Sequence, residues 1–339
     1  MSVSLENEIP AAGSRPAAFR PARHQTSVPE EQLLNSADAG ILIHRVGQLK
    51  YEFREEGLDF SSELVELINS KQAGYISIFH FEELFGTHNR LHWLLHLKRP
   101  DDYARMLDMV DHSDTWRDVS QRNRLPRKGG GNWERMFVEG SMSETIICPQ
   151  HGLSAHDEHD EHDDHDHSGD TFQPAAFHQT TLPAERLLNS VNSALTVHRT
   201  FRVPYALREE ARVFAFEWCG YVNKALEGEL TAFLYEEMWG QQDTLHLLLH
   251  AASLDVYHRL LELERGDQGL RALRASQRLP ESAGGAVWHN TLIEGSQRDT
   301  LWVPVHRRTG TEGGRTAGAE DSRSGTEGIR TADAEGTKP

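Results

Sequence analysis

Cysteine is scarce in this sequence of 339 residues, which contains only Cys148 and Cys219. The two lie at non-equivalent places in the internal repeat described below. They therefore form neither a disulfide framework nor a paired metal motif. This usage is typical of a reducing compartment, and we expect a cytoplasmic protein.

Long apolar runs are missing as well. No stretch of about 18 apolar residues, the length that crosses a bilayer, occurs anywhere in the chain. The first 22 residues also lack the apolar core of a signal peptide. The sequence therefore predicts no membrane partner.

Basic residues are outnumbered, with 35 Lys and Arg against 52 Asp and Glu and a net charge of −17. The segment 151–170 contributes eight acids and no Lys or Arg, so the rest of the chain is only mildly acidic. Binding to nucleic acid requires clustered cations that neutralise phosphates, and no such cluster is present. We expect no nucleic-acid partner.

What the sequence does have is an internal repeat. Shifted by 154 positions, residues 24–126 align with residues 178–280. The residues kept in both copies include several polar ones that packing alone does not demand. In the first copy these include Gln25, Ser36, His44, Glu83, Gly86, His92 and His96, and in the second Gln179, Ser190, His198, Glu237, Gly240, His246 and His250.

The repeat and the composition of the remaining segments divide the chain into five parts. We predict a disordered N-terminus at 1–22, a first repeat at 23–150, a His/Asp-rich linker at 151–172, a second repeat at 173–306 and a disordered tail at 307–339. The tail is rich in Gly, Thr, Ala and Glu and has few apolar side chains to bury. Two folded units follow from this division.

Within each copy the patterns alternate between strand and helix. In the first copy, β-branched and apolar residues predict strands at 40–53, 75–85, 90–97 and 135–148, and Gly86-Thr87-His88-Asn89 predicts a hairpin turn between the middle two. Helical spacing predicts helices at 58–70 and from Pro100, with Tyr103, Met106, Leu107 and Val110 on the buried stripe of the second.

The order βαββαβ is that of a ferredoxin-like unit, in which both helices cover one face of a four-stranded sheet. The other face needs a cover, and the equivalent face of the second copy is the simplest one. The fold class we predict is therefore α+β, with two ferredoxin-like βαββαβ repeats packed sheet to sheet as a pseudo-dimeric α+β barrel. Such a chain would be a monomer or a low-order homo-oligomer.

The segments 74–85 and 90–110, with the turn between them, resemble the dimeric α+β barrel superfamily. The resemblance is strongest to NIPSNAP-like and antibiotic-biosynthesis-monooxygenase-like proteins, or to an actinobacterial branch beside them. It implies a small-molecule enzyme, because members of the superfamily include cofactor-free oxygenases and haem proteins. It brings no fingerprint motif, so it assigns no residue, and a haem with a His axial ligand stays possible.

The strand at 90–97 has two different faces. One face is wholly apolar and should meet the helices, and the other carries His92 and His96 into the barrel. The apolar face consists of Leu91, Trp93, Leu95 and Leu97. If the hairpin pairs residue 85 with residue 90, Glu83 lies opposite His92 and Phe79 lies opposite His96.

We also expect the first strand to run parallel beside the third, which would bring His44 next to His92. His44, His92 and Glu83 would then form a metal site, since two imidazoles and one carboxylate suit iron, zinc or copper. By symmetry the second copy would use His198, His246 and Glu237. The alternative is that these buried side chains only satisfy one another's hydrogen bonds.

His96 and His250 are excluded from these sets by distance. Four residues along a strand span roughly 13 Å, which is too far for His92 and His96 to share one ion. We give His96 and His250 a separate catalytic role, either in binding the substrate or in shuttling protons.

Histidine and acid residues alternate at 156–167, outside the repeated unit. Such a tract suits Zn²⁺, Ni²⁺ or Cu²⁺ and also serves as a solvated spacer.

The leading hypothesis is a metal-dependent enzyme, of oxygenase or hydrolase type, that acts on a small molecule inside the barrel. The alternatives are a metal- or ligand-binding protein without catalysis and a structural protein with hydrogen-bonded core histidines.

Overall fold

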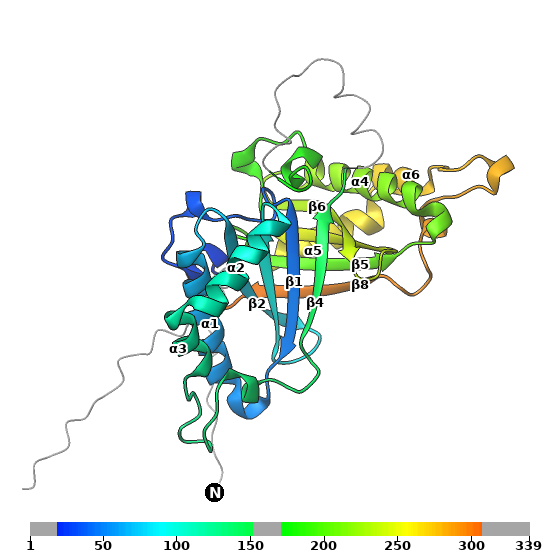
Figure 1. Cartoon of the computed structure of the whole chain (residues 1–339). Coiled ribbons are helices and arrows are strands. Elements are labelled where there is room, and N and C mark those ends of the chain that lie inside the picture. Colours follow the sequence, from blue (N-terminus) through cyan, green and yellow to red (C-terminus); the bar gives the residue numbers. More distant parts are fainter. Residues whose placement is uncertain (1–18, 152–170, 307–339) are drawn as a thin grey trace, which may run out of the picture. The chain divides into compact units, whose positions relative to one another are not determined.

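The computed structural model describes residues 19–151 and 171–306 (Figure 1). In the first half the elements are β1 (Ile41–Gln48), α1 (Arg54–Lys71), β2 (Ile76–Phe85), β3 (Arg90–Leu97), α2 (Pro100–His112), α3 (Asp114–Gln121) and β4 (Ser143–Pro149). In the second half they are β5 (Leu195–Arg202), α4 (Arg208–Ala225), β6 (Leu230–Trp239), β7 (Thr244–Ala251), α5 (Leu254–Gly266), α6 (Gln268–Ala275) and β8 (Arg298–Pro304).

The strands close into one antiparallel barrel in the order β1-β3-β2-β8-β5-β7-β6-β4. Within each half the order is therefore the same, β2-β3-β1-β4 and β6-β7-β5-β8. The halves are joined along two seams, where β2 pairs with β8 and β4 pairs with β6. The mixed α+β fold and the barrel that both halves build agree with the expectation from the sequence.

The predicted parallel pairing of the first and third strands is wrong, because β1 pairs with β3 antiparallel and places Val46 opposite His92. The reason lies in the connections. Helix α1 returns the chain so that β2 runs in the direction of β1. The tight turn at 86–89 then reverses β3, which inserts between them.

The two faces of the sheet are assigned as the alternation predicts. Leu91, Trp93 and Leu95 pack with Leu64 and Ile68 of α1 in a core outside the barrel. A second core on the same side of the other half includes Phe214 and Trp218 of α4. In Figure 1, α1 lies beside β2 and α4 lies beside β6, as their contacts require.

The barrel interior is filled by side chains from both halves. A third core joins these residues: Leu42, Phe79, Phe81, Leu94 and Ile147 from the first half, with Phe233, Tyr235, Leu248 and Trp302 from the second. Since strands of both halves contribute, neither sheet leaves its inner face bare to water. This is the face that also carries the kept histidines.

Several predicted boundaries differ from the structure. The first strand ends at Gln48 rather than at 53, because Tyr51–Phe53 forms a 3-10 turn. Residues Trp133–Met136 form another 3-10 turn, so the last strand starts at Ser143 and not at 135. Leu107 is 45% exposed and does not belong to a buried stripe.

Two short helices, α3 and α6, were not predicted. Each begins where a side chain at the N-cap accepts a backbone hydrogen bond: Ser113 accepts from Trp116 N, and Asp267 accepts from Leu270 N.

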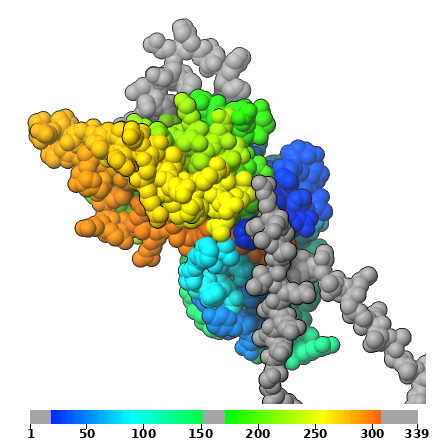
Figure 2. All heavy atoms as spheres, turned by 180° about the vertical axis from the view of Figure 1, so that it is seen from behind, coloured from blue at the N-terminus to red at the C-terminus, as the bar shows by residue number. Residues whose placement is uncertain are grey.

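A space-filling view shows the second half from α5 onward, in yellow and orange, as one continuous surface (Figure 2).

The predicted tail at 307–339 lies outside the described residues, as do residues 1–18 and 152–170 of the other two segments predicted to lack a fold. The described end of the linker contacts the barrel: Phe172 N donates to Lys98 O at 2.8 Å and its ring stacks on Trp239. Among residues 19–151 and 171–306, no helix has the length and apolar character needed to cross a bilayer.

Candidate active site

Four histidines that are kept in both copies meet inside the barrel. His44 on β1 and His92 on β3 are diagonal neighbours on the inner face, and His44 Nε2 lies 2.9 Å from His92 Nδ1. In the second half His198 Nε2 lies 2.8 Å from His246 Nδ1. Each pair of rings is stacked, with centroids 5.2 and 5.1 Å apart.

The two pairs form one cluster. The ring of His44 stands edge-on to that of His198, with centroids 5.0 Å apart. The indole of Trp302, on β8, packs against both of these rings and against His92, with centroid distances of 4.8, 4.7 and 4.5 Å. Trp302 is fully buried, and its Nε1 has no hydrogen-bond partner among the described residues.

The hairpin register differs from the predicted one. Phe81, not Glu83, lies opposite His92, and Ser77, not Phe79, lies opposite His96. The turn closes around the carboxylate, since Glu83 Oε1 accepts a hydrogen bond from Thr87 N at 2.7 Å. Ladder pairing therefore stops before Glu83.

Glu83 still reaches its predicted histidine from this diagonal position. Its Oε2 lies 3.3 Å from His92 Nε2, and Glu237 Oε2 lies 3.5 Å from His246 Nε2. The second contact has an ion-pair distance but fails as a hydrogen bond, so His246 Nε2 has no hydrogen-bond partner within the described residues. The first half therefore holds the tighter version of the same arrangement.

Two kept glycines make room for these carboxylates. Gly86 and Gly240 adopt φ angles of +138° and +141°, and a Cβ at either position would collide with the carboxylate of Glu83 or Glu237. Only glycine combines this backbone conformation with so close an approach. The kept glycine and the kept glutamate are thus one structural unit.

The hydrogen-bond network fixes the tautomers in the first half. An ionised Glu83 can only accept, so His92 Nε2 donates to it and His92 Nδ1 is left as an acceptor. His44 Nε2 then donates to His92 Nδ1, which leaves the lone pair of His44 Nδ1 free. In the second half the contact between His198 Nε2 and His246 Nδ1 repeats, while Glu237 lies 3.5 Å from His246 Nε2.

Burial keeps the central histidines neutral. The pKa values of His44 and His198 lie well below 6.5 because the charged rings would be desolvated, and the neighbouring histidines add to the effect. Burial also lowers the pKa of His92, against the opposing pull of Glu83. The pKa of Glu83 is lowered too, because hydrogen bonds from His92 and Thr87 outweigh its burial. The lowered pKa values keep His44, His92 and His198 neutral at neutral pH.

The predicted metal ligands come together, but as a chain. His92 contacts His44 through Nδ1 and Glu83 through Nε2, and the two nitrogens of an imidazole point in different directions. One ion therefore cannot touch all three groups as they are arranged. In the described part of the chain, no three His, Cys, Asp or Glu side chains converge as metal ligands. A haem also finds no room at His44, whose ring is surrounded by His92, His198 and Trp302.

His96 and His250 lie apart from this cluster, at a contact between the halves. His96 Nε2 lies 2.8 Å from Ser190 Oγ, and His250 Nε2 lies 2.8 Å from Ser36 Oγ. Each serine oxygen also accepts the backbone N–H of the other serine, at 3.0 Å. All four side chains are fully buried, and burial lowers the pKa of each histidine to about 3.

A cavity of about 490 Å³ opens at the end of the barrel in the second half, and Glu237 forms part of its wall. The Glu237 side chain is 11% exposed, whereas that of Glu83 is 2% exposed. In the first half Arg90 Nη1 lies 3.6 Å from Glu83 Oε2, and the equivalent position in the second half is Thr244, which lines the cavity. With Thr in place of Arg beside it, the second carboxylate is therefore the more exposed of the two.

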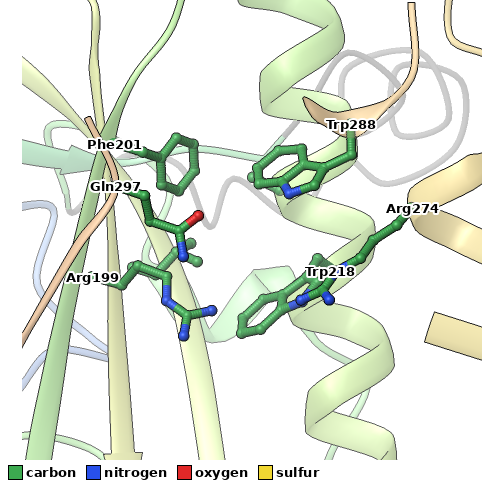
Figure 3. Close-up of a pocket in the computed structure, with 8 residues that line it drawn as sticks. Arg199, Phe201, Trp218, Arg274, Trp288 and Gln297 are labelled. Carbon is green, nitrogen blue, oxygen red and sulfur yellow. The ribbon is translucent and has the colours of Figure 1, made fainter. Parts of the chain in front are cut away.

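A smaller cavity of about 20 Å³ lies on the helix side of the sheet, between Arg199 and Phe201 of β5 and Trp218 of α4 (Figure 3). Arg199 forms ion pairs with Glu264 and Asp299 at 2.6 and 2.8 Å, so its charge is already neutralised. The space suits about one water molecule. It is separated from the histidine cluster by the sheet.

Sequence reasoning missed Ser36, Ser190 and Trp302. The two serines are kept in both copies, and that signal could have selected them. Trp302 has Ile147 at its equivalent position, so the repeat gives no signal for it. Its role at the centre of the cluster is visible only once β8 has been placed beside β5.

The chain belongs to the family of unknown function DUF6039, whose sequence profile matches residues 11–310. None of the curated proteins matches the sequence.

Several solved structures are similar in fold. A protein described as a "Putative monooxygenase" from Fusobacterium nucleatum is 9% identical with a TM-score of 0.46, covering 79% of this chain and 93% of its own. An anthrone oxidase-like protein is 12% identical with a TM-score of 0.43, covering 85% and 99%. A mutant chlorite dismutase from Candidatus Nitrospira defluvii, in complex with cyanide, is 12% identical with a TM-score of 0.44, covering 79% and 92%. At these TM-scores the matches support no conclusion about activity.

Proposed function

We propose that the protein is an enzyme that acts on a small molecule by proton transfer, with Glu237, His246 and His198 as its acid–base chain. The observation that carries the proposal is the position of Glu237: it lines the 490 Å³ cavity on one side and reaches the buried histidine pair on the other. A cavity of this size suits a small-molecule ligand.

The chain can move a proton in either direction. A proton taken up at His198 Nδ1 releases the Nε2 proton to His246 Nδ1, and His246 Nε2 then gives its proton to Glu237. The carboxylic acid at the cavity wall is a general acid, and the carboxylate is a general base in the reverse direction. Glu237 is the group that would touch the substrate, and the two histidines supply and orient its proton.

The predicted catalytic role of His96 and His250 is not needed for this chemistry. Both rings are hydrogen-bonded to serines of the opposite half and are buried away from the cavity. In the proposal they hold the two halves in register.

The test is turnover of a small-molecule mixture followed by mass spectrometry. The purified protein is expected to deplete at least one component, and Glu237→Gln and His246→Asn should abolish the depletion. Glu83→Gln is the matched control in the closed half and should keep it. No depletion by the parent protein, or depletion that survives in both second-half variants, would overturn the proposal.

Metal dependence is a second candidate, and one observation favours it. Two nitrogen pairs, 2.9 and 2.8 Å apart, face each other within one cluster of four imidazoles. Imidazole suits zinc, copper or iron, and an ion could replace the proton that each pair shares. Ligation would require the rings to turn, since no three ligand side chains of the described residues converge as they stand.

Metal analysis of the parent protein and of a variant that lacks residues 152–170 distinguishes the sources of any bound ion. Stoichiometric metal that survives the deletion and is lost in His44→Ala supports an ion in the barrel. Metal lost with the deletion alone belongs to the histidine-acid tract. Retention of stoichiometric metal in both His44→Ala and His198→Ala would rule out the cluster as the ligand set.

The architecture suggests an origin that we also propose. Each half has the strand order β2-β3-β1-β4 or its equivalent with helices on one side, as expected of a duplicated ferredoxin-like unit in the dimeric α+β barrel superfamily. Such a protein would work in the cytoplasm as a monomer or a low-order homo-oligomer.

A further inference from the structure

The cavity at Glu237 is polar in ways that the first half is not. Thr200, Arg202 and Arg298 line it, and the equivalent positions in the first half are Val46, Gln48 and Ser143. Together with Thr244 in place of Arg90, these differences give the cavity beside Glu237 a charged lining that the matching positions around Glu83 do not repeat. The charges of its lining therefore indicate which charges a ligand of this cavity would have.

One of the four charged side chains in the lining is already neutralised, and a second is the acid–base group of the proposed function. Arg202 Nη2 pairs with Asp243 Oδ2 at 2.8 Å. Glu237 accepts a hydrogen bond from Gln241 N and lies 3.5 Å from His246. Arg202 is therefore not left to balance a charge on a ligand.

The other two, Arg298 and Glu294, have no ion-pair partner among residues 19–151 and 171–306, and they do not pair with each other. In the first half the residue equivalent to Glu294 is Glu139, which pairs with Lys50 at 2.8 Å. Proline at position 204 replaces that lysine in the second half. One cation and one anion thus face the same cavity without partners.

We propose that this cavity binds a small zwitterion, with its carboxylate at Arg298 and its ammonium group at Glu294. A simple anion would meet the unpaired carboxylate of Glu294, and a simple cation would meet the unpaired guanidinium of Arg298. Hydroxyl groups of Thr200, Thr244 and Ser296 supply further hydrogen bonds. The inference rests on the proposed function for its site and adds the chemical class of the substrate.

Calorimetric titration with free amino acids tests the proposal, using α-, β-, γ- and δ-amino acids to vary the separation of the two charges. At least one should bind, and its N-acetyl and amide derivatives should each bind at least about tenfold more weakly, because each loses one charge-assisted contact. Arg298→Gln should remove the preference for the free carboxylate, and Glu294→Gln the preference for the free ammonium group.

Two variants serve as controls for the site. Glu139→Gln changes the equivalent glutamate in the first half and should leave binding unchanged. Thr244→Arg introduces the residue that covers Glu83 in the first half and should abolish binding. If the acetylated and amidated forms bind as tightly as the free amino acid, or if no amino acid binds, the proposal is wrong.

Binding and turnover separate this inference from the proposed function. His198→Gln does not alter the cavity lining and should bind the zwitterion like the parent. Binding without any turnover that depends on Glu237 would defeat the acid–base chain and leave the zwitterion site standing. Turnover that depends on Glu237, but of a molecule that is not a zwitterion, would support the acid–base chain and defeat the zwitterion site.

Discussion

His44 Nε2 and His92 Nδ1 lie 2.9 Å apart inside the barrel, and Glu83 contacts the other nitrogen of His92. One acceptor-only carboxylate therefore sets the tautomers of two rings. His198 and His246 repeat the contact at 2.8 Å, so both halves hold the same histidine pair.

Nitrogen-15 chemical shifts of labelled histidines test this order. All four rings should carry their proton on Nε2 at neutral pH, with Nδ1 unprotonated. Glu83→Gln should produce a mixture of tautomers at His92, because an amide can donate as well as accept, and should leave His246 unchanged. A parent spectrum with protonated Nδ1 at His92 would contradict the proposed chain.

The buried histidines should make the fold sensitive to acid. Burial lowers the pKa values of His44 and His198 well below 6.5 and those of His80, His96 and His250 to about 3. The folded state therefore binds fewer protons than the unfolded state below pH 6.5. The contribution of these neutral histidines to the free energy of unfolding is fully present above pH 6.5 and is lost as the pH falls below it.

Each such histidine contributes about 1.4 kcal/mol per pH unit, so the free energy of unfolding should fall by roughly 5 kcal/mol or more between pH 6 and pH 5. Urea unfolding at a series of pH values measures this slope. The exposed His88 is the control, and His88→Gln should leave the slope unchanged. A free energy that is constant from pH 7.5 to 5 would show that the rings are not buried as described.

Asp38 should make the fold less stable as the pH rises, which is opposite to the effect of the buried histidines. Burial raises its pKa to about 7, and Asp38 Oδ1 has no hydrogen-bond partner in the described structure. Its contribution to stability is present below the unfolded pKa near 4 and is lost as the pH rises towards 7. The second half carries Asn192 at the equivalent place.

Asp38→Asn should therefore raise the free energy of unfolding at pH 8 by on the order of 2–4 kcal/mol, and the gain should vanish near pH 4. Chemical denaturation at the two pH values checks this difference. An equal gain at both would point to packing and not to the buried charge.

The sequence predicted the inner face of the barrel well, because strand parity depends only on neighbouring residues. His92 and His96 lie on the opposite side of β3 from Trp93, as the alternation indicated. Strand direction and hairpin register were wrong, because both depend on how a turn closes. Here the Glu83 carboxylate occupies the turn, and nothing in the local pattern of apolar residues reveals that.

The sequence predicted which residues form the site but not how they are arranged. The kept residues identified His44, His92 and Glu83 as a group, and the structure brings them together. Whether they form a chelate or a chain depends on ring orientation, which spacing does not determine. The open cavity depends on differences between the copies, such as Thr244 for Arg90, and a comparison that looks for kept residues passes over these.

The serines between the halves should stabilise the barrel. Ser36→Ala removes a hydroxyl that contacts His250 Nε2 and accepts Ser190 N, and leaves both groups buried without a partner. We expect a loss of about 1–3 kcal/mol in the free energy of unfolding, and the same for Ser190→Ala. Ser70→Ala, at an exposed residue, is the control and should cost far less.

The double variant of Ser36 and Ser190 distinguishes a coupled network from two separate contacts. Because each serine accepts the backbone N–H of the other, the combined loss should differ from the sum of the single losses by about 0.5 kcal/mol or more, on the order seen for residues in one network. Additive losses in thermal or urea unfolding would show that the two hydrogen-bonded groups act independently.

Gly86 and Gly74 separate backbone strain from displacement of the carboxylate. Both have positive φ, +138° and +79°, but a Cβ at Gly74 meets nothing within 4 Å, whereas one at Gly86 collides with Glu83. Gly74→Ala should cost about 1 kcal/mol from strain alone. Gly86→Ala should cost more and should also push Glu83 away from His92.

The second effect has its own readout. In Gly86→Ala the nitrogen-15 shifts of His92 should move towards a mixture of tautomers, and Gly74→Ala should leave them at the parent values. Gly240→Ala should do the same to His246, since its Cβ collides with Glu237. If Gly86→Ala lowers stability without changing the tautomer of His92, the carboxylate does not control the histidine pair, and the acid–base chain loses its first link.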